Sequence, residues 1–174
     1  MTTLADKLAA VQLVLLDVDG VLTEGRIVYA DSGEEIKSFS VRDGYGIRLM
    51  LDADIQVGIV TGRCSAALRH RCLDLGIKMI HEGARQKAPL LAAIMADTGL
   101  SAAAIAFMGD DLPDLPIMTR VGCAVAVADA HEELRRRADM VTTAPGGRGA
   151  VRELAEALLK ARGEWDSLLS SLTE

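Results

Sequence analysis

The chain has 174 residues, of which half are hydrophobic, a quarter are charged and only 3% are aromatic. This length predicts a single domain with one sizeable core, and the composition excludes a disordered chain. The formal net charge is −6, and the 19 basic residues form no long stripe. Nucleic acid is therefore not an expected partner. Nor is a membrane, since no apolar run is long enough to span a bilayer.

The N-terminal apolar run Leu8–Leu16 resembles a signal peptide only superficially. It contains Gln12, leads straight into acidic residues and has no small-residue cleavage site after it, so we interpret it as a buried strand. The three cysteines are an odd number without metal-ligand or CxxC spacing. We expect Cys64, Cys72 and Cys123 to be reduced residues of a cytoplasmic protein.

Short apolar runs then alternate with longer segments of helical period. Sheet strands are predicted at Val11–Leu16, Val57–Val60, Lys78–His81, Ile105–Met108, Cys123–Val127 and Met140–Thr142. Helices are predicted at Gly44–Leu51, Ser65–Leu75, Lys87–Thr98, Leu115–Val121, Glu132–Ala138 and Ala150–Ala161. Most of the strands lack apolar/polar alternation, which is typical of a parallel sheet covered on both faces. The pattern predicts a Rossmann-like α/β fold with a doubly wound parallel sheet.

A β-hairpin at about residues 26–40 interrupts this alternation. Two strand-like runs, Arg26–Ala30 and Glu35–Phe39, flank the turn signal Asp31–Glu34. A hairpin offers unpaired strand edges, which proteins rarely leave exposed. At the other end of the chain, we expect residues 163–174 to form a loosely ordered tail.

Four polar motifs follow the predicted strands, where open α/β sheets bind their ligands. In Asp17–Thr23 (DVDGVLT), two carboxylates at i and i+2 can face one pocket as the backbone turns at Gly20. In Val60–Arg63 (VTGR), a hydroxyl and a glycine amide at a helix start form an anion site. Lys87 adds a cation near the start of a helix, and Gly109–Asp114 (GDDLPD) adds three carboxylates.

Each motif alone has an ordinary structural explanation, as a turn, a helix cap or a solvated lysine. Their order and placement make the combination more specific. Clustered carboxylates repel one another unless a cation lies among them, and a hard divalent ion suits oxygen ligands. An aspartate nucleophile, a hydroxyl, a lysine and a Mg²⁺ site together predict a phosphoryl-transfer centre.

In this order the motifs resemble the four motifs of the haloacid dehalogenase superfamily of phosphatases. Longer segments resemble the 3-deoxy-D-manno-octulosonate (KDO) 8-phosphate phosphatase family, a capless branch of that superfamily: Phe39–Arg48, Gly109–Leu112, Ala124–His131 and Gly146–Glu153. The resemblance covers roughly Val11 to Arg162. It implies a Mg²⁺-dependent enzyme that hydrolyses KDO 8-phosphate through an aspartyl-phosphate, in the synthesis of lipopolysaccharide precursors.

The resemblance also implies a role for each motif. Asp17 would be the nucleophile and Asp19 the general acid/base. Mg²⁺ would be held by the carboxylates of Asp17 and Asp110 and by the backbone carbonyl of Asp19. Asp111 or Asp114 would steady these ligands from the outer shell. The remaining phosphoryl oxygens would be bound by Thr61, the Gly62 amide and Lys87.

A sugar acid carries a carboxylate besides its phosphate, and arginines suit that group. The resemblance implies substrate binding by Ser40, Val41, Arg42, Asp43, Gly44, Arg48, Arg63 and Arg71. Arg63 and Arg71 are eight positions apart, near enough to one helix face to address one pocket, although Arg71 suits a surface position equally well. Arg148 can reach a neighbour's pocket or cap the last helix. The histidines are interpreted as structural: His70, His81 and His131.

The spacing of the motifs leaves no room for a cap domain over the pocket. Asp17 and Thr61 are 44 positions apart, and the hairpin and one helix fill that interval. Between Thr61 and Lys87 there is room only for a helix and a strand. The site is therefore predicted to be open unless another chain closes it. In the resembled family the hairpins assemble a tetramer and the neighbouring subunit covers the site, so we expect a homotetramer.

Three alternatives remain open. A receiver-type signalling domain also uses Asp, Thr, Lys and Mg²⁺, but its acceptor aspartate normally ends the third strand, whereas Asp17 ends the first. A non-catalytic tetramerisation module would not need an intact Asp17 and Asp19. A phosphatase for a nine-carbon, sialic-acid-like sugar 9-phosphate would share every catalytic motif, and the sequence separates it poorly from an eight-carbon enzyme.

Overall fold

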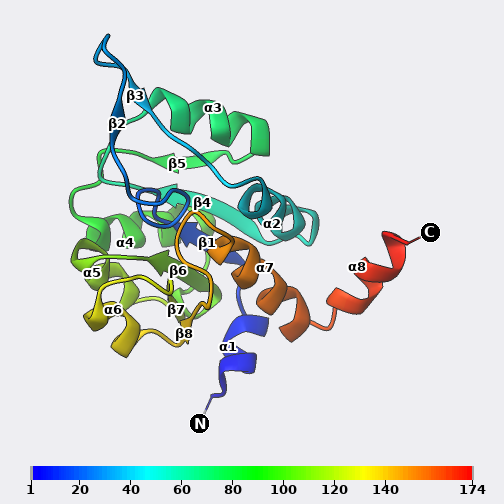
Figure 1. Cartoon of the computed structure of the whole chain (residues 1–174). Coiled ribbons are helices and arrows are strands. Elements are labelled where there is room, and N and C mark those ends of the chain that lie inside the picture. Colours follow the sequence, from blue (N-terminus) through cyan, green and yellow to red (C-terminus); the bar gives the residue numbers. More distant parts are fainter. Residues whose placement is uncertain (1, 174) are drawn as a thin grey trace.

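The computed structural model describes residues 2–173, and Figure 1 shows how their elements are arranged. The strands are β1 (Leu13–Leu16), β2 (Val28–Tyr29), β3 (Glu35–Ile36), β4 (Gln56–Val60), β5 (Met79–His81), β6 (Ile105–Gly109), β7 (Cys123–Ala126) and β8 (Met140–Val141). The helices are α1 (Leu4–Ala9), α2 (Val41–Asp52), α3 (Ala66–Leu75), α4 (Lys87–Thr98), α5 (Leu115–Met118), α6 (Glu132–Arg137), α7 (Ala150–Ala161) and α8 (Trp165–Ser171). Two 3₁₀ helices, η1 (Ala102–Ala104) and η2 (Leu112–Asp114), flank β6.

Six strands form one parallel sheet in the order β5-β4-β1-β6-β7-β8. The chain runs outward from β1 through β4 to β5, then crosses back over β1 to β6 and continues outward on the other side. The winding therefore reverses around β1, and such a reversal opens a crevice at the carboxyl ends of the central strands. The predicted doubly wound, Rossmann-like sheet is confirmed.

Helices cover both faces of the sheet (Figure 1). The crossovers place α2 and α3 on one face and α4, α5 and α6 on the other, while α7 returns to pack on α1 and α2. All four residues of β1 are buried, as expected for a central strand. At Gly46, a Cβ atom would lie 2.8 Å from the Cα of Arg152, so the missing side chain permits the close approach of α2 and α7.

The hairpin is present but shorter than predicted. β2 and β3 pair antiparallel over two residues each, with Val28 opposite Ile36 and Tyr29 opposite Glu35. Gly33 has a positive φ of 83° in the turn between them, where a residue without a side chain is favoured. The hairpin stands apart from the main sheet at the end of the molecule that carries β5 and α3 (Figure 1).

Two parts of the chain differ from the sequence-based expectation. The predicted strand over Leu8–Leu16 begins only at Leu13, because Thr3 and Asp6 form a capping box that starts a helix whose buried residue is Leu8. The tail predicted as loosely ordered contains α8, where the Trp165 ring lies 5.1 Å from Lys160 Nζ. Within residues 2–173, none of the helices combines the length and the apolar composition that crossing a bilayer requires.

Candidate active site

Three carboxylates meet at the carboxyl ends of β1 and β6. Asp17 directly follows β1, Asp110 follows β6, and Asp114 ends η2; one oxygen from each lies within 4.8 Å of the others. Asp114 is almost fully buried, and its Oδ2 accepts a hydrogen bond of 3.0 Å from the backbone N–H of Asp110. The β1–β6 pairing explains why residues far apart in the sequence share one site.

Lys87 supplies the positive charge at the centre of this cluster. It is the first residue of α4, its side chain is only 4% exposed, and its Nζ lies 2.8 Å from Asp17 Oδ1 and 2.6 Å from Asp114 Oδ1. Burial disfavours the charge of this lysine, but the two carboxylates outweigh that effect and raise its pKa. The same Nζ lies 5.5 Å from the centre of the Phe107 ring, a cation–π contact.

The charge of Lys87 does not fully offset the repulsion among these buried carboxylates. Burial, followed by the charge of Asp114, raises the pKa of Asp17 to about 6. Burial, followed by the charges of Asp17 and Asp114, raises the pKa of Asp110 to about 8. A divalent ion among these oxygens would relieve the repulsion, and Mg²⁺ prefers such hard oxygen ligands. The donor set therefore fits the predicted magnesium site.

Gly20 explains how Asp110 can approach the loop after β1. Its φ of +96° suits glycine, and a Cβ atom there would lie 2.1 Å from Asp110 Oδ2. Asp111 is placed differently, because its carboxylate accepts a 2.8 Å hydrogen bond from Leu112 N–H at the start of η2. Of the two residues predicted for the outer shell, Asp114 reaches the cluster and Asp111 serves as a helix cap.

Asp19 turns away from the cluster toward the hairpin. Its Oδ1 forms an ion pair with Lys37, whose Nζ also lies 3.4 Å from Glu35 Oε1. Arg63 Nε lies 3.6 Å from Asp19 Oδ2, and Arg63 Nη2 donates a 2.7 Å hydrogen bond to Glu35. Sequence reasoning missed Lys37 and Glu35, although their i, i+2 spacing in a strand already places them on one face.

The predicted phosphate-binding loop follows β4, the neighbour of β1. Leu16 is opposite Ile59, so Thr61 lies beside the first residues after β1. Thr61 is buried and its hydroxyl accepts a 3.3 Å hydrogen bond from the Arg63 N–H. Gly62 is exposed, and a Cβ there would meet nothing closer than 3.9 Å, so its surroundings are open to a ligand.

Among the residues predicted to bind the sugar, some are exposed at the start of α2 and others are buried with partners within the protein. Ser40 caps α2 by accepting a 3.3 Å hydrogen bond from Asp43 N–H, while Val41 and Arg42 are exposed. Asp43 is buried, and its two oxygens accept hydrogen bonds of 3.0 Å from the backbone N–H groups of Gly149 and Arg152. In this structure Asp43 therefore caps α7 from another helix.

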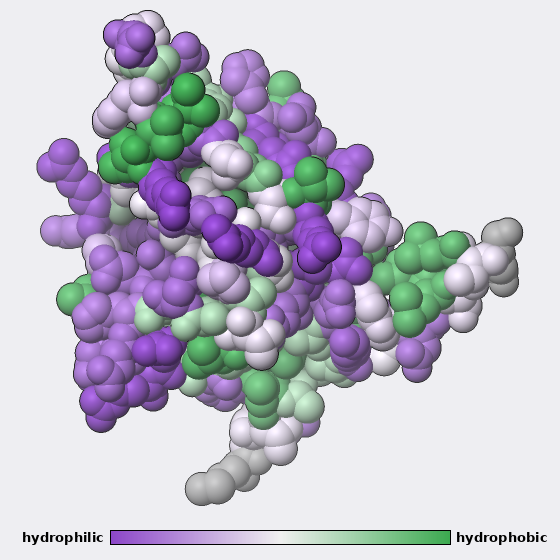
Figure 2. All heavy atoms as spheres, in the orientation of Figure 1, coloured by the Kyte–Doolittle hydropathy of each residue, from purple (hydrophilic) through white to green (hydrophobic). Residues whose placement is uncertain are grey.

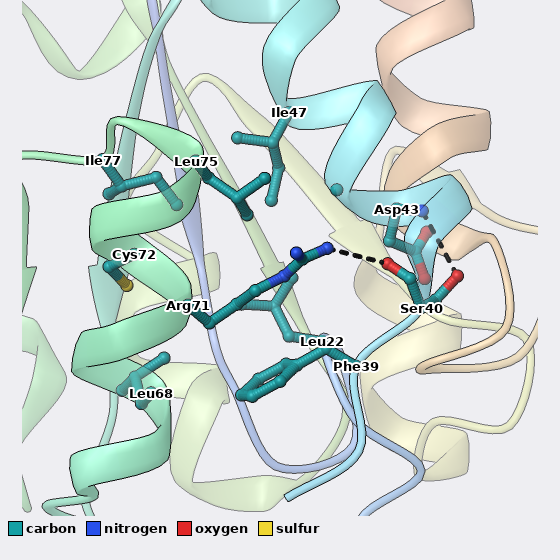
Figure 3. A pocket seen from close by; sticks show the side chains of 11 residues that line it. Leu22, Phe39, Ser40, Asp43, Ile47, Leu68, Arg71, Cys72, Leu75 and Ile77 are labelled. Carbon is teal, nitrogen blue, oxygen red and sulfur yellow. Dashed lines mark hydrogen bonds between the residues drawn. The ribbon is translucent and has the colours of Figure 1, made fainter.

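Arg71 reaches from α3 into the small pocket beneath the start of α2 (Figure 3). Its Nη2 donates a 3.3 Å hydrogen bond to the Ser40 carbonyl, and it occupies the space beside Gly44, where a Cβ would lie 2.1 Å from the same atom. Arg63 precedes α3, which begins at Ala66, so the predicted placement of both arginines on one helix face is wrong. The two side chains have different partners.

Arg48 is not brought to the carboxylate cluster. It lies two turns into α2 and donates a 3.1 Å hydrogen bond to the Leu75 carbonyl at the end of α3. Arg148 does not cap α7 and instead pairs with Glu24 at 2.9 Å. His131 has a structural role, because its Nδ1 accepts a hydrogen bond at the start of α6.

A glycine-rich loop braces the backbone after Asp17 from the opposite side. A Cβ at Gly146 would lie only 1.7 Å from the Gly20 carbonyl oxygen, and Gly147 N–H donates a 2.8 Å hydrogen bond to the Val21 carbonyl. Only residues without side chains permit this approach. The adjacent glycines were a signal for this contact that sequence reasoning did not use.

The chain is similar in sequence to known proteins. Residues 76–154 match the model of the haloacid dehalogenase-like hydrolase family. The KDO 8-phosphate phosphatase KdsC of Escherichia coli K12 is 47% identical over 156 residues, which cover 90% of this chain and 83% of that protein. The Salmonella typhi KdsC is 46% identical, over 95% of this chain and 88% of that protein.

Solved structures agree with the sequence comparison. The KDO 8-phosphate phosphatase of Yersinia pestis has a TM-score of 0.92 and 42% identity, over 94% of this chain and 88% of that one. The enzyme of Moraxella catarrhalis, crystallised with a magnesium ion, a phosphate ion and KDO, has a TM-score of 0.95 and 36% identity, over 97% of both chains. The chain therefore belongs to the KDO 8-phosphate phosphatase family of the haloacid dehalogenase superfamily.

Proposed function

We propose that the chain is a Mg²⁺-dependent phosphatase that hydrolyses KDO 8-phosphate to KDO and phosphate, in the synthesis of lipopolysaccharide precursors. The observation that carries this proposal is the position of Asp17 at the topological switch point, 2.8 Å from the buried Lys87 and beside Asp110. A nucleophile, a fixed cation and a metal site meet there, as phosphoryl transfer requires. The names of the relatives, and the KDO bound in the Moraxella catarrhalis structure, support this substrate.

Mg²⁺ would be held by the carboxylates of Asp17 and Asp110 and by the backbone carbonyl of Asp19. Asp114 would support them, because it fixes both Lys87 and the backbone of Asp110. When bound, the ion supplies positive charge that orients the phosphoryl group and offsets its negative charge. We assign the remaining phosphoryl oxygens to Thr61, the Gly62 amide and Lys87.

The residues then divide the hydrolysis into two steps. An oxygen of Asp17 attacks phosphorus, the bond from phosphorus to the sugar oxygen breaks, and Asp19 gives its proton to that departing oxygen. In the second step Asp19 takes a proton from water, whose oxygen attacks the phosphorus of the aspartyl-phosphate. Phosphate leaves and Asp17 is restored.

The sugar would lie over the start of α2 and the loop before α3. Ser40–Gly44 line this side, and Arg63 and Arg71 offer guanidinium groups for the sugar carboxylate. Arg71 would exchange its 3.3 Å hydrogen bond with the Ser40 carbonyl for the substrate. Arg48 we assign to the α3 terminus instead, because its partner is the Leu75 carbonyl.

Phosphate release from a panel of sugar phosphates tests the proposal. The panel includes the eight-carbon and nine-carbon keto-sugar acids, each with Mg²⁺ and with EDTA. We expect Mg²⁺-dependent release with a strong preference for KDO 8-phosphate. Preference for the nine-carbon acid would keep the mechanism and change the substrate, whereas no release from any compound would refute the enzymatic proposal.

We further propose a homotetramer in which a neighbouring subunit covers the open, capless site. The support is the hairpin, which exposes Ile27, Val28, Tyr29 and Ile36, each at 49–61%. Figure 2 shows a hydrophobic patch in the region of the hairpin, and such patches favour association.

Light scattering should give a mass near four times 18.5 kDa. Replacing Val28 and Tyr29 with Ser should dissociate the assembly and lower activity. Leu73→Ser is the matched control, because it removes an exposed apolar side chain from α3 and should leave the mass unchanged. An active monomer would refute the shared site.

We place the enzyme in the cytoplasm, and the support is chemical. Cys64, Cys72 and Cys123 are all free thiols, and buried thiols such as Cys72 and Cys123 persist in a reducing compartment. Fractionation of cells against a periplasmic marker tests this assignment, and recovery with that marker would refute it.

A further inference from the structure

The hairpin carries a buried lysine into the active site. The side chain of Lys37 is only 2% exposed, although it belongs to a two-stranded hairpin whose other face is open to water. Its Nζ contacts Asp19 Oδ1 on one side and lies 3.4 Å from Glu35 Oε1 on the other. Lysines are rarely buried unless they are paired, so this contact holds the side chain in one place.

Strand alternation separates two tasks of the hairpin. Glu35, Lys37 and Phe39 face the body of the protein, whereas Ile36 and Ser38 face outward. The outward face carries the apolar residues proposed above for assembly. The inward face carries charge to Asp19, and nothing about assembly requires a cation at that position.

The two oxygens of Asp19 have different surroundings. Oδ1 is held by Lys37, whereas Oδ2 is buried and has no hydrogen-bond partner within residues 2–173. Arg63 Nε lies 3.6 Å from Oδ2, which is too far for a hydrogen bond. A buried oxygen without a partner costs free energy, and such atoms in native structures are often functional.

We propose that Lys37 is a positioning residue that holds the Asp19 carboxylate by Oδ1 and thereby orients it to exchange a proton with the departing sugar oxygen and with water. Glu35, itself bound by Arg63, fixes Lys37 from behind. The side chains of Lys37 and Arg63 thus alternate with those of Glu35 and Asp19 in a closed set of contacts. This inference rests on the proposed role of Asp19 in the hydrolysis.

The test compares Lys37→Met with the unchanged enzyme on two substrates in Mg²⁺. The sugar phosphate has a poor leaving group that needs a proton, whereas p-nitrophenyl phosphate releases a stable anion that needs none. The ratio kcat/KM reports the steps up to departure of the leaving group. We expect kcat/KM for KDO 8-phosphate to fall about 10- to 100-fold, a fraction of a full acid–base contribution, with little change for p-nitrophenyl phosphate.

Three variants make the result specific. Arg26→Met removes an exposed cation from the same hairpin and should leave kcat/KM unchanged for both substrates. Glu35→Gln weakens the contact that holds Lys37, so it should cause a smaller fall in kcat/KM for KDO 8-phosphate and again little change for p-nitrophenyl phosphate. This variant keeps the inference testable if Lys37→Met misfolds. Lys37→Arg keeps the charge and should recover part of the selective loss. Light scattering and thermal melting confirm that each variant keeps its assembly and fold.

Asp19→Asn distinguishes a failure of the acid/base role of Asp19 from a failure of the positioning role of Lys37. If Asp19→Asn lowers kcat/KM equally for both substrates, the acid/base role of Asp19 is wrong and the proposed mechanism fails with it. Asp19→Asn can instead lower kcat/KM for the sugar phosphate alone. If Lys37→Met then lowers kcat/KM equally for both substrates, or for neither, Lys37 does not position the acid. A rise in KM alone for KDO 8-phosphate would instead assign Lys37 to substrate binding.

Discussion

Replacing Asp43 distinguishes its capping role from the substrate-binding role that the family resemblance implies. Its carboxylate accepts two hydrogen bonds of 3.0 Å from the N–H groups that start α7, and α7 packs along α2. Hydrogen bonds to a charged group contribute about 1.5–3 kcal/mol each, and a helix cap about 0.5–2 kcal/mol. Because water can partly replace the lost acceptor, we expect Asp43→Ala to lower the free energy of unfolding by about 2–4 kcal/mol.

Urea denaturation and thermal melting at one fixed protein concentration measure this loss, since assembly makes stability depend on concentration. In a chain of this length the loss corresponds to a fall in Tm of roughly 10 °C. Asp43→Asn keeps one acceptor oxygen and should lose less. Asp52→Ala removes an exposed aspartate from the same helix and should change stability by no more than about 0.5 kcal/mol. Unchanged stability of Asp43→Ala together with a raised KM would refute the capping argument.

Three other changes test the centre of the site. Asp17→Asn should bind KDO 8-phosphate in calorimetry yet release no phosphate, and normal turnover would exclude Asp17 as nucleophile. Because the pKa of Asp110 is raised to about 8, the folded chain without metal holds an extra proton there, so its stability should fall as pH rises from about 4 to 8. Over the same interval Mg²⁺ binding should release protons and tighten, and pH-independent affinity in calorimetry would contradict this. Gly146→Ala should abolish phosphate release by displacing the Gly20 carbonyl, and wild-type activity would show that the loop tolerates the clash.

The sequence predicts most of the sheet and its helices because burial leaves a periodic trace. α4 and α7 begin and end where their apolar spacing indicates, and the buried strands stand out as uninterrupted apolar runs. α8 has no buried residues, so it leaves no such trace. α1 depends on a short capping box at Thr3 rather than on an apolar stripe, and its one buried residue, Leu8, merges with the strand signal.

The site likewise contains residues whose positions the sequence predicts and residues whose contacts it does not predict. The positions of Asp17, Lys87 and Asp110 are predictable because Asp17 and Asp110 directly follow strands and Lys87 begins a helix. The partners of Asp43 and Lys37 are not, because they depend on how distant elements pack. Asp43 finds its partners at the start of α7, and Lys37 contacts Asp19 only when the hairpin lies beside the loop after β1.

The contact between the glycine-rich loop and the loop after β1 has a consequence for biosynthesis. A ribosome makes the Asp17 segment well before Gly146 and Gly147. Until then the backbone at Gly20 and Val21 lacks the neighbour that holds it. The Asp17 loop therefore acquires this support only after Gly147 has been made, so a nascent chain that stops short of the glycine-rich loop lacks a complete site for sugar phosphates.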